Sequence, residues 1–208
     1  VRAPSRRAAS ETFIRSNLAG LPFCQTAVFG DERPLQRPLS FLHGLAVLAS
    51  KAMTRLGLLR LASLPAAWTT WLLLLRHRPD VVLVDFGFHA VRVMEATAWW
   101  DVPLVVHFRG SDASSEAKFS QLRDRYRRLF QLTAGVIVKS RPMQTVLVEL
   151  GADPTTLLIS PSGADPALFH GATPESAPPT FLAVGRLVAK KGPLLTLQAF
   201  SKMRASLP

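Results

Sequence analysis

The sequence feature that most constrains the fold is a regular alternation of short apolar segments with longer helical ones between Pro79 and Ser160. The apolar segments have the length of strands, and they are Val81 to Asp85, Leu104 to Phe108, Val136 to Lys139 and Thr156 to Ser160. Continuous apolar strands separated by helices are typical of a parallel sheet that is covered on both faces. The sequence therefore predicts a doubly wound α/β domain.

The segments between these strands carry the apolar spacing of helices. We expect helices over 11–20, His89 to Trp100, Lys118 to Leu132 and Arg141 to Leu150, and long helical stretches over 40–77 that break near Pro65. The last of the four has clear boundaries, because Ser140 is placed to cap its first turn and Gly151 to end it. A further short strand is expected between Gln25 and Gly30.

The chain divides into two domains by composition. Residues 171–180, GATPESAPPT, have no periodicity and are rich in proline and alanine, which is typical of a linker. We expect an N-terminal domain over 1–170 and the start of a second domain over 181–208, with a strand from Phe181 to Val184 and a helix from Gly192 to Leu207. Since Val1 is not an initiating methionine, we interpret the sequence as a fragment and expect the first strand of the sheet to precede it.

Charge and composition narrow the classes of partner. The 208 residues carry a net charge of +11 and are 48% hydrophobic, so the chain is basic but can fill a core. Its basic residues are spread over nearly every segment without the aromatic stripe that stacks bases, which disfavours nucleic acid. An anionic small ligand or an anionic lipid headgroup fits the charge at least as well. Cys24 is the single cysteine, so the sequence has neither an internal disulfide nor a cysteine-based metal site.

Two segments could contact a membrane. The stretch from Gly57 to Leu75 is nearly long enough to span a bilayer, but Arg60 and Pro65 interrupt it, which favours a buried or membrane-leaning helix. The predicted helix from Lys118 to Leu132 has an apolar stripe and a basic face. That face is either simply solvated or a docking surface for an anionic membrane. Its apolar positions are Phe119, Leu122, Tyr126, Leu129 and Phe130, and its basic positions are Arg123, Arg125, Arg127 and Arg128.

A candidate anion site follows the strand predicted in the second domain. Gly185 and Arg186 end that strand, and Lys190, Lys191 and Gly192 lead into the next helix. The free N–H groups at a helix start favour an anion, Arg186 could contact phosphate oxygens with its forked guanidinium, and either lysine could add a point charge. We expect a diphosphate here, although a solvated basic turn explains the same pattern. The glycine spacing fits neither a Walker loop nor the dinucleotide fingerprint.

A second candidate site follows the strand from Leu104 to Phe108. His107, Arg109 and Asp112 gather at its carboxyl end, where Gly110 permits a tight turn. Histidine can transfer a proton near neutral pH, arginine can hold an anion, and aspartate can orient either or bind hydroxyls. A histidine at a strand end is also common as a purely structural residue. Asp85 and His89, at the preceding strand-to-helix turn, are candidates to line the same cleft.

Six segments form an ordered set of motifs along the chain, and they are SETFI (10–14), PDVVLVDFG (79–87), PLVVHFRGSD (103–112), VIVKSRPMQTVLVELGAD (136–153), ISPSGADPALF (159–169) and FLAVGRLVAKKG (181–192). This set resembles the glycosyltransferases of family four, a retaining, nucleotide-sugar-dependent group with the GT-B fold. The resemblance implies a Rossmann-like N-terminal acceptor-side domain with a parallel sheet and the truncated start of a second, nucleotide-sugar-binding Rossmann-like domain.

The resemblance also implies site roles. Arg186 and Lys191 would bind the donor diphosphate and neutralise the leaving group, and Asp112 is the safer residue to carry over from the His-Gly-x-Asp motif of the family. Here the residue before Gly110 is Arg109 and the histidine, His107, lies two residues earlier, so either could meet the transferred sugar. The paired glutamates of the family would follow Pro208, and we therefore expect residues 1–208 alone to be inactive.

The function that this resemblance implies is transfer of a sugar from a nucleotide-diphosphate sugar to a glycan or lipid-linked acceptor, with retention of configuration. Surface polysaccharide synthesis is a candidate pathway, and the resemblance implies no metal or other cofactor. The partners would be the nucleotide sugar and the acceptor, without nucleic acid. We expect a cytoplasmic protein, either free or at the inner face of the membrane. The alternative is a non-catalytic basic Rossmann-like module that binds nucleotides or anionic polymers.

Overall fold

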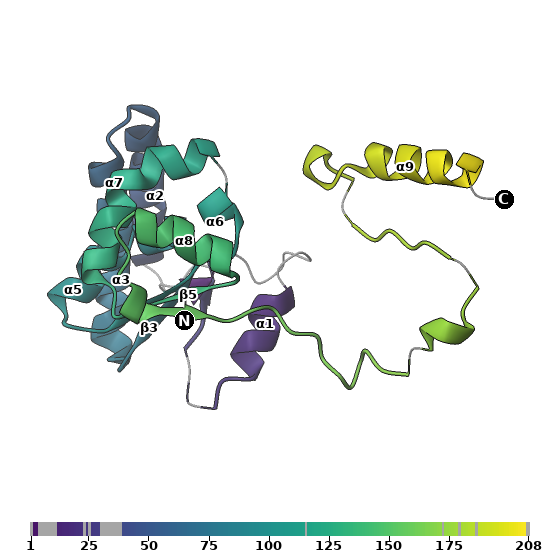
Figure 1. The fold of residues 1–208 in the computed structure, drawn as a ribbon. Helices are drawn as coiled ribbons and strands as arrows, with labels where there is room; N and C mark the ends of the chain where they lie inside the picture. The colour runs from purple at the N-terminus through teal and green to yellow at the C-terminus, as the bar shows by residue number, and fades with distance from the viewer. Residues whose placement is uncertain are drawn as a thin grey trace. The chain divides into compact units, whose positions relative to one another are not determined.

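A computed structural model describes the chain over residues 2–3, 12–22, 24, 26–29, 39–114, 116–171, 173–178, 180–185 and 187–206. These residues divide into two compact units, 1–162 and 163–208. The first unit is an α/β domain built on a parallel sheet (Figure 1). The doubly wound α/β class predicted from the alternation of segments is confirmed.

The sheet has six strands in the order β2-β1-β3-β4-β5-β6, and every neighbouring pair is parallel. The strands are β1 (Arg2–Ala3), β2 (Val28–Phe29), β3 (Val82–Asp85), β4 (Leu104–His107), β5 (Gly135–Val138) and β6 (Leu157–Ile159). The four apolar runs predicted as strands between Pro79 and Ser160 form β3 to β6, each within a few residues of its expected bounds.

One strand of the sheet was not predicted from the sequence, and it lies between β2 and β3. The expectation that a first strand precedes Val1 stays a prediction. Arg2–Ala3 forms β1 and pairs in parallel with both β2 and β3. Arginine and alanine make no apolar run, so the sequence carried no strand signal here. The position is recognisable only once both neighbouring strands are in place.

The helices of the first unit are α1 (Thr12–Ala19), α2 (Leu39–Arg55), α3 (Leu59–His77), α4 (Gly87–Ala90), α5 (Met94–Trp99), α6 (Ser111–Ser114), α7 (Glu116–Leu132) and α8 (Arg141–Glu149), with a 3-10 turn at Pro154–Thr156. Ser140 caps α8 as predicted, since its hydroxyl accepts a hydrogen bond from the backbone N–H of Met143. Gly151 ends α8 at φ 109°, and the N–H groups of Gly151 and Ala152 return to Val148 and Leu147.

Two helix boundaries differ from the prediction. The break expected near Pro65 lies at Gly57, which takes φ 75° between α2 and α3, while Pro65 lies inside α3. Glycine enters this left-handed conformation without steric cost, whereas proline only removes one backbone hydrogen bond from a helix that tertiary packing supports. The helix expected from His89 to Trp100 is divided into α4 and α5, which are separated by a turn over 91–93.

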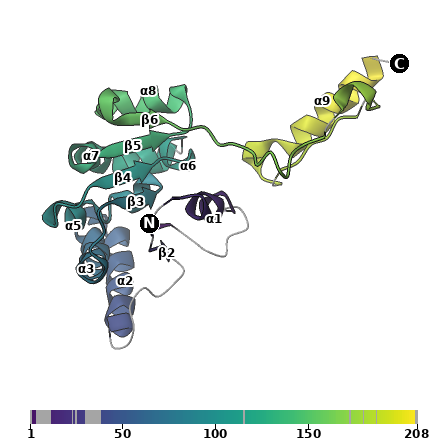
Figure 2. The same cartoon turned by 90° about the horizontal axis from the view of Figure 1, so that it is seen from below.

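The core lies on one face of the sheet. Side chains of β3, β4 and β5 pack there against α4, α5, α7 and α8, and α1 lies on the other side of the sheet (Figure 2). The predicted apolar stripe of α7 is confirmed, because Tyr126 and Leu129 are fully buried and Phe119, Leu122 and Phe130 pack against the core.

The basic positions of α7 do not form one solvated face. Arg125 is half-buried and donates to the hydroxyl of Ser63 in α3 and to the carbonyl of Val91. Arg127 pairs with Asp124 at 3.2 Å, and the Arg128 guanidinium lies 3.7 Å from a Glu95 carboxylate oxygen. Arg125 therefore joins α7 to α3 and to the end of α4, which the helical periodicity did not indicate.

The second unit contains 3-10 turns at Pro174–Ser176 and Ala189–Lys191 and the helix α9 (Pro193–Ser206), which begins and ends close to the predicted bounds. The strand expected from Phe181 to Val184 is absent from the described residues 180–185, where Leu182 and Val184 are 86% and 87% exposed. A parallel strand is stable only when a neighbour satisfies its N–H and C=O groups, and the described residues of this unit include no other strand. The domain boundaries at 170 and 181 stay a prediction.

Candidate functional site

Ionisable side chains meet at the carboxyl ends of the central strands. Asp85 ends β3 and lies in register with His107, which ends β4. Because side chains alternate along a strand, these two project to the sheet face opposite the main core, together with Leu83 and Val105. Both are buried, with 2% and 5% of their surface exposed. The carboxyl edge of a parallel sheet is where such domains bind their ligands.

Arg109 closes this cluster from the turn after β4. Its Nε and Nη2 atoms donate to Oδ1 of Asp85 at 2.8 and 2.6 Å, and both side chains are almost fully buried. Burial raises the pKa of Asp85, while the Arg109 charge and hydrogen bonds oppose that rise. A buried guanidinium without a carboxylate would carry a large desolvation cost, so each residue requires the other. The pair fixes the direction of the Arg109 side chain.

His107 is held neutral within this cluster. Burial, followed by the positive charges of Arg109 and Lys139, lowers the pKa of His107 to about 3. Its Nδ1 lies 3.7 Å from Oδ1 of Asp85. Its Nε2 is buried and has no hydrogen-bond partner among the residues that the structure describes. A neutral imidazole with one unoccupied nitrogen can donate to or accept from a bound hydroxyl, according to its tautomer.

Lys139 is a member of this site that the sequence analysis did not single out. It follows directly after β5, and by strand alternation it projects to the same sheet face as His107 and Asp85. Burial and the charge of Arg109 lower the pKa of Lys139, and Asp85 opposes that shift. Its place at the carboxyl end of the strand adjacent to β4 was the signal that could have identified it.

Asp112 connects two loops through its carboxylate. Oδ1 accepts hydrogen bonds from the backbone N–H groups of Arg109 and Gly110 at 3.0 and 2.8 Å, and Oδ2 accepts from the N–H of Gly87 at 2.9 Å. The residue is fully buried, which raises the pKa of Asp112, and the backbone hydrogen bonds oppose that rise. Both oxygens are thus engaged with the protein. The geometry makes Asp112 a positioning residue that joins the turn after β3 to the turn after β4.

The turn after β3 is strained and tightly packed. Phe86 has φ 71° and ψ 128°, which is rare for a bulky side chain, and it stacks on Phe88 at 5.1 Å between ring centroids. A Cβ at Gly87 would lie 2.4 Å from a ring atom of Phe108, so any other residue would require the Phe108 ring to shift. His89 packs on Phe88 at 4.7 Å and is half-buried. Residues held in sparsely populated conformations concentrate at functional sites, and this turn borders the cluster.

The predicted diphosphate site lies in the second unit and is described only in part. Arg186 falls outside the described residues, and of Lys190 only the backbone, in the 3-10 turn Ala189–Lys191, is described. Gly192 takes φ 55° and directly precedes α9, so the turn does end at the start of a helix. Lys191 is exposed, as is Gly185. The anion-binding role of these residues stays a prediction.

Comparison with known protein families decides the class of this domain. The family model described as the glycosyl transferase 4-like domain matches residues 14–163, which is well over half of the chain. The chain belongs to the glycosyl transferase 4-like family. No curated protein matches the chain.

The charged cluster lies within the part of the chain that matches the glycosyl transferase 4-like family. The matched residues include the whole cluster, which consists of Asp85, His107, Arg109 and Lys139, and they also include Asp112. The basic turn over 185–192 lies outside them. The family supports a glycosyltransferase domain with a Rossmann-like parallel sheet. The family-four resemblance stated from the motifs is confirmed at this level.

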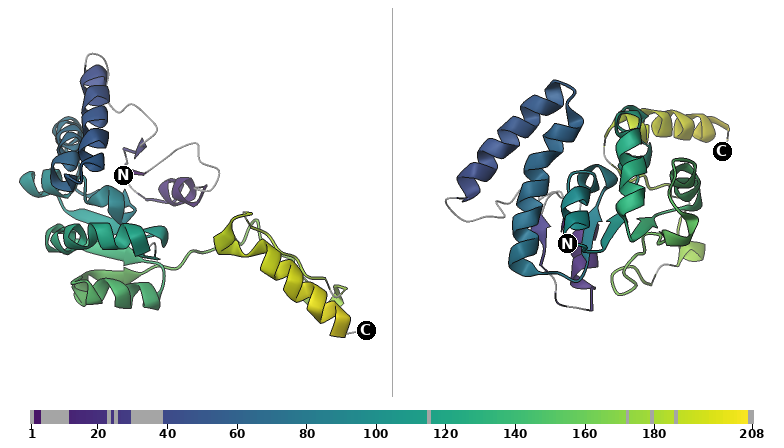
Figure 3. Two further views of the ribbon diagram at one scale, coloured as in Figure 1. Left: turned by 90° about the horizontal axis from the view of Figure 1, so that it is seen from above. Right: turned by 90° about the vertical axis from the view of Figure 1, so that its left-hand side faces the viewer.

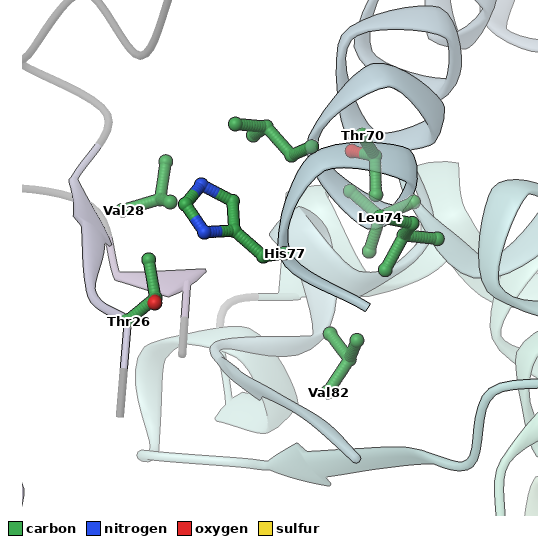
Figure 4. A pocket seen from close by; sticks show the side chains of 8 residues that line it. Thr26, Val28, Thr70, Leu74, His77 and Val82 are labelled. Atoms are coloured by element: carbon green, nitrogen blue, oxygen red, sulfur yellow. The ribbon is translucent and has the colours of Figure 1, made fainter. Parts of the chain in front are cut away.

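An apolar pocket lies apart from the cluster, near the amino end of β3. It is formed where α3 and β2 approach one another (Figure 4) and is lined by Thr26, Val28, Thr70, Leu73, Leu74, His77, Val82 and Val93. Val82 is the first residue of β3, whereas Asp85 is its last, so pocket and cluster lie toward opposite ends of this strand. Among the described residues, no group of three or more histidine, cysteine, aspartate or glutamate side chains could hold a metal ion.

Proposed function

We propose that the protein transfers a sugar from a nucleotide-diphosphate sugar to a hydroxyl group of a glycan or lipid-linked acceptor, with retention of anomeric configuration. The supporting observation is the cluster of Asp85, His107, Arg109 and Lys139 at the carboxyl edge of the sheet, in a domain of the glycosyl transferase 4-like family.

The chemical step has simple requirements. The bond from the anomeric carbon to the diphosphate oxygen breaks, a bond from the same carbon to the acceptor oxygen forms, and the hydroxyl proton leaves to the departing diphosphate. Negative charge grows on the diphosphate, so cations near it stabilise the transition state. We assign this role to Arg186 and Lys191, with Lys190 and the backbone of Gly185 and Gly192 completing the site, on the family resemblance of their segment.

The cluster in the first unit suits an acceptor. The buried Nε2 of neutral His107 can form a hydrogen bond with an acceptor hydroxyl, and Lys139 adds a positive charge on the same sheet face. Arg109 is directed by Asp85, and Asp112 fixes the turn that carries Arg109. In this assignment His107 contacts the substrate, while Asp85 and Asp112 act through their neighbours.

The test is a transfer assay on the protein in its full encoded length. Release of nucleoside diphosphate from a panel of UDP- and GDP-sugars is measured with and without acceptor, and NMR of the product gives the anomeric configuration. We expect Arg186→Ala and Lys191→Ala to abolish most turnover, and the control Lys202→Ala, an exposed lysine of α9, to leave it unchanged. Turnover in the presence of a chelator tests the proposed independence from metal.

The outcomes separate the two candidate functions. Acceptor-dependent turnover with a product of inverted configuration would overturn the retaining mechanism. Nucleotide binding without turnover for any donor would favour the non-catalytic module instead. Equal turnover in the Lys191→Ala and Lys202→Ala variants would remove the lysine from the diphosphate site.

A further inference from the structure

The hairpin of α2 and α3 presents an apolar outer surface. One face of α3 is buried against the domain through Ala62, Ala67 and Leu74, whereas a second face is exposed. The exposed side chains recur at intervals of three and four residues, and they are Leu61, Leu64, Trp68, Trp71 and Leu75, with exposed fractions of 45%, 51%, 36%, 37% and 39%. Such spacing places them in one stripe along the helix.

The helix α2 carries a second exposed apolar stripe. It packs along α3 as the outermost layer of the domain (Figure 3). Phe41, Leu45 and Leu48 also form a stripe and are 70%, 50% and 63% exposed. Exposed apolar stripes on two helices that pack together indicate an interaction site on a folded domain. We call these eight side chains the hairpin surface.

The charge around the hairpin surface indicates its partner. From Arg33 to Pro79 the sequence contains no aspartate or glutamate, and its basic residues are Arg33, Arg37, Lys51, Arg55, Arg60, Arg76 and Arg78. Of the described side chains, Lys51 and Arg55 are exposed in the last turns of α2, and Arg76 is exposed in the last turn of α3. A second copy of this surface would carry the same charge and be repelled, whereas an anionic surface would be attracted.

The hairpin surface has the composition of helices that lie in the membrane interface. Tryptophan prefers the level of the lipid headgroups, leucine and phenylalanine enter the acyl region, and basic residues at the helix ends contact anionic headgroups. No helix among the described residues is long and apolar enough to span a bilayer. We propose that the α2–α3 hairpin docks the protein on the surface of an anionic phospholipid bilayer, with Trp68 and Trp71 at the headgroup level.

The chain offers matched tryptophans for the test. Its four tryptophans are Trp68 and Trp71 on the hairpin and Trp99 and Trp100 at the end of α5, and the α5 pair is 65% and 37% exposed. The protein is mixed with vesicles of phosphatidylcholine alone or with phosphatidylglycerol, carrying bromine on the acyl chains as a fluorescence quencher. We expect quenching with the anionic vesicles in the wild type and in Trp99→Phe/Trp100→Phe, and its loss in Trp68→Phe/Trp71→Phe.

A second pair of variants tests the charge without touching the core. Arg55→Ser with Arg76→Ser should weaken binding to anionic vesicles in a sedimentation assay by roughly thirtyfold, since each basic residue near such a membrane contributes on the order of 1 kcal/mol. The control Arg123→Ser with Arg141→Ser removes two exposed arginines from α7 and α8 and should have a smaller effect. Circular dichroism confirms that each variant is folded.

Three results would overturn the proposal. Equal quenching after loss of either tryptophan pair would place the membrane contact elsewhere. Equal sedimentation with neutral and anionic vesicles would remove the charge argument. A concentration-dependent dimer that shields Trp68 and Trp71 without lipid would assign the hairpin surface to a second copy. None of these measurements uses a sugar, so a result that refutes membrane docking leaves the proposed glycosyl transfer untouched.

Discussion

Replacing Asp112 tests whether this residue positions the site or takes part in the chemistry. Its two oxygens accept hydrogen bonds from three backbone N–H groups, on Gly87, Arg109 and Gly110. In Asp112→Asn the remaining oxygen can serve Arg109 and Gly110, but the new amide group then faces the N–H of Gly87. Loss of one charge-assisted bond and an unsatisfied buried donor together cost about 2–3 kcal/mol. Asp112→Ala leaves all three donors without an acceptor and should cost about 3–5 kcal/mol.

Urea unfolding followed by circular dichroism measures these losses, and the transfer assay is run on the same samples. Asp153→Asn is the matched control, because Asp153 also accepts from a backbone N–H, that of Thr155 at 2.8 Å, but does so on the surface. We expect it to have little effect. If Asp112→Asn were as stable as the wild type and yet inactive, the carboxylate would act on the substrate and the positioning argument would be refuted.

The other predictions concern the surroundings of Asp112. Gly87→Ala should destabilise the fold by about 2 kcal/mol through overlap with the Phe108 ring, and Phe108→Leu should recover part of this in the double variant; strictly additive losses in urea unfolding would contradict the overlap. The pKa of His107 falls from 6.5 to about 3 on folding. The neutral imidazole therefore lowers the free energy of unfolding only below about pH 6.5, and this loss grows as the pH falls towards about 3. Between about pH 7 and about pH 5 the loss is about 2 kcal/mol, and His107→Gln should remove that part of the pH dependence of the unfolding free energy. Lys139→Met should raise the pKa of His107 in an NMR titration, since it removes a nearby positive charge; an unchanged pKa would place Lys139 too far away to act.

Much of the fold was predictable from the sequence because its signals are local. Strands β3 to β6 are short apolar runs, and α8 has both a serine cap and a glycine stop. The misses arose where pairing or packing decides. Arg2–Ala3 is a strand because two neighbours hold it, and Phe181 to Val184 is not a strand where no described residue of its unit pairs with it.

The sequence predicted where the candidate site lies, but it did not predict what most of its residues do. The residues His107, Arg109 and Asp112 follow a strand that ends at the ligand-binding edge of a parallel sheet, and the sequence singled them out for that reason. The sequence could not show that both oxygens of Asp112 accept hydrogen bonds from backbone N–H groups. Nor could it show that Asp85 accepts hydrogen bonds from Arg109, or that Lys139 shares a sheet face with His107. These contacts join residues that lie far apart in the chain.

The sequence by itself determined the alternation of strands and helices, the parallel sheet and the edge at which ionisable residues gather, because apolar periodicity and turn residues act over a few positions. The tertiary structure alone decided the protonation of the site. His107 is neutral because burial removes water from the imidazole and because Arg109 and Lys139 add positive charge beside it. Desolvation and charge proximity depend on which segments meet in space, and no local pattern of residues records that.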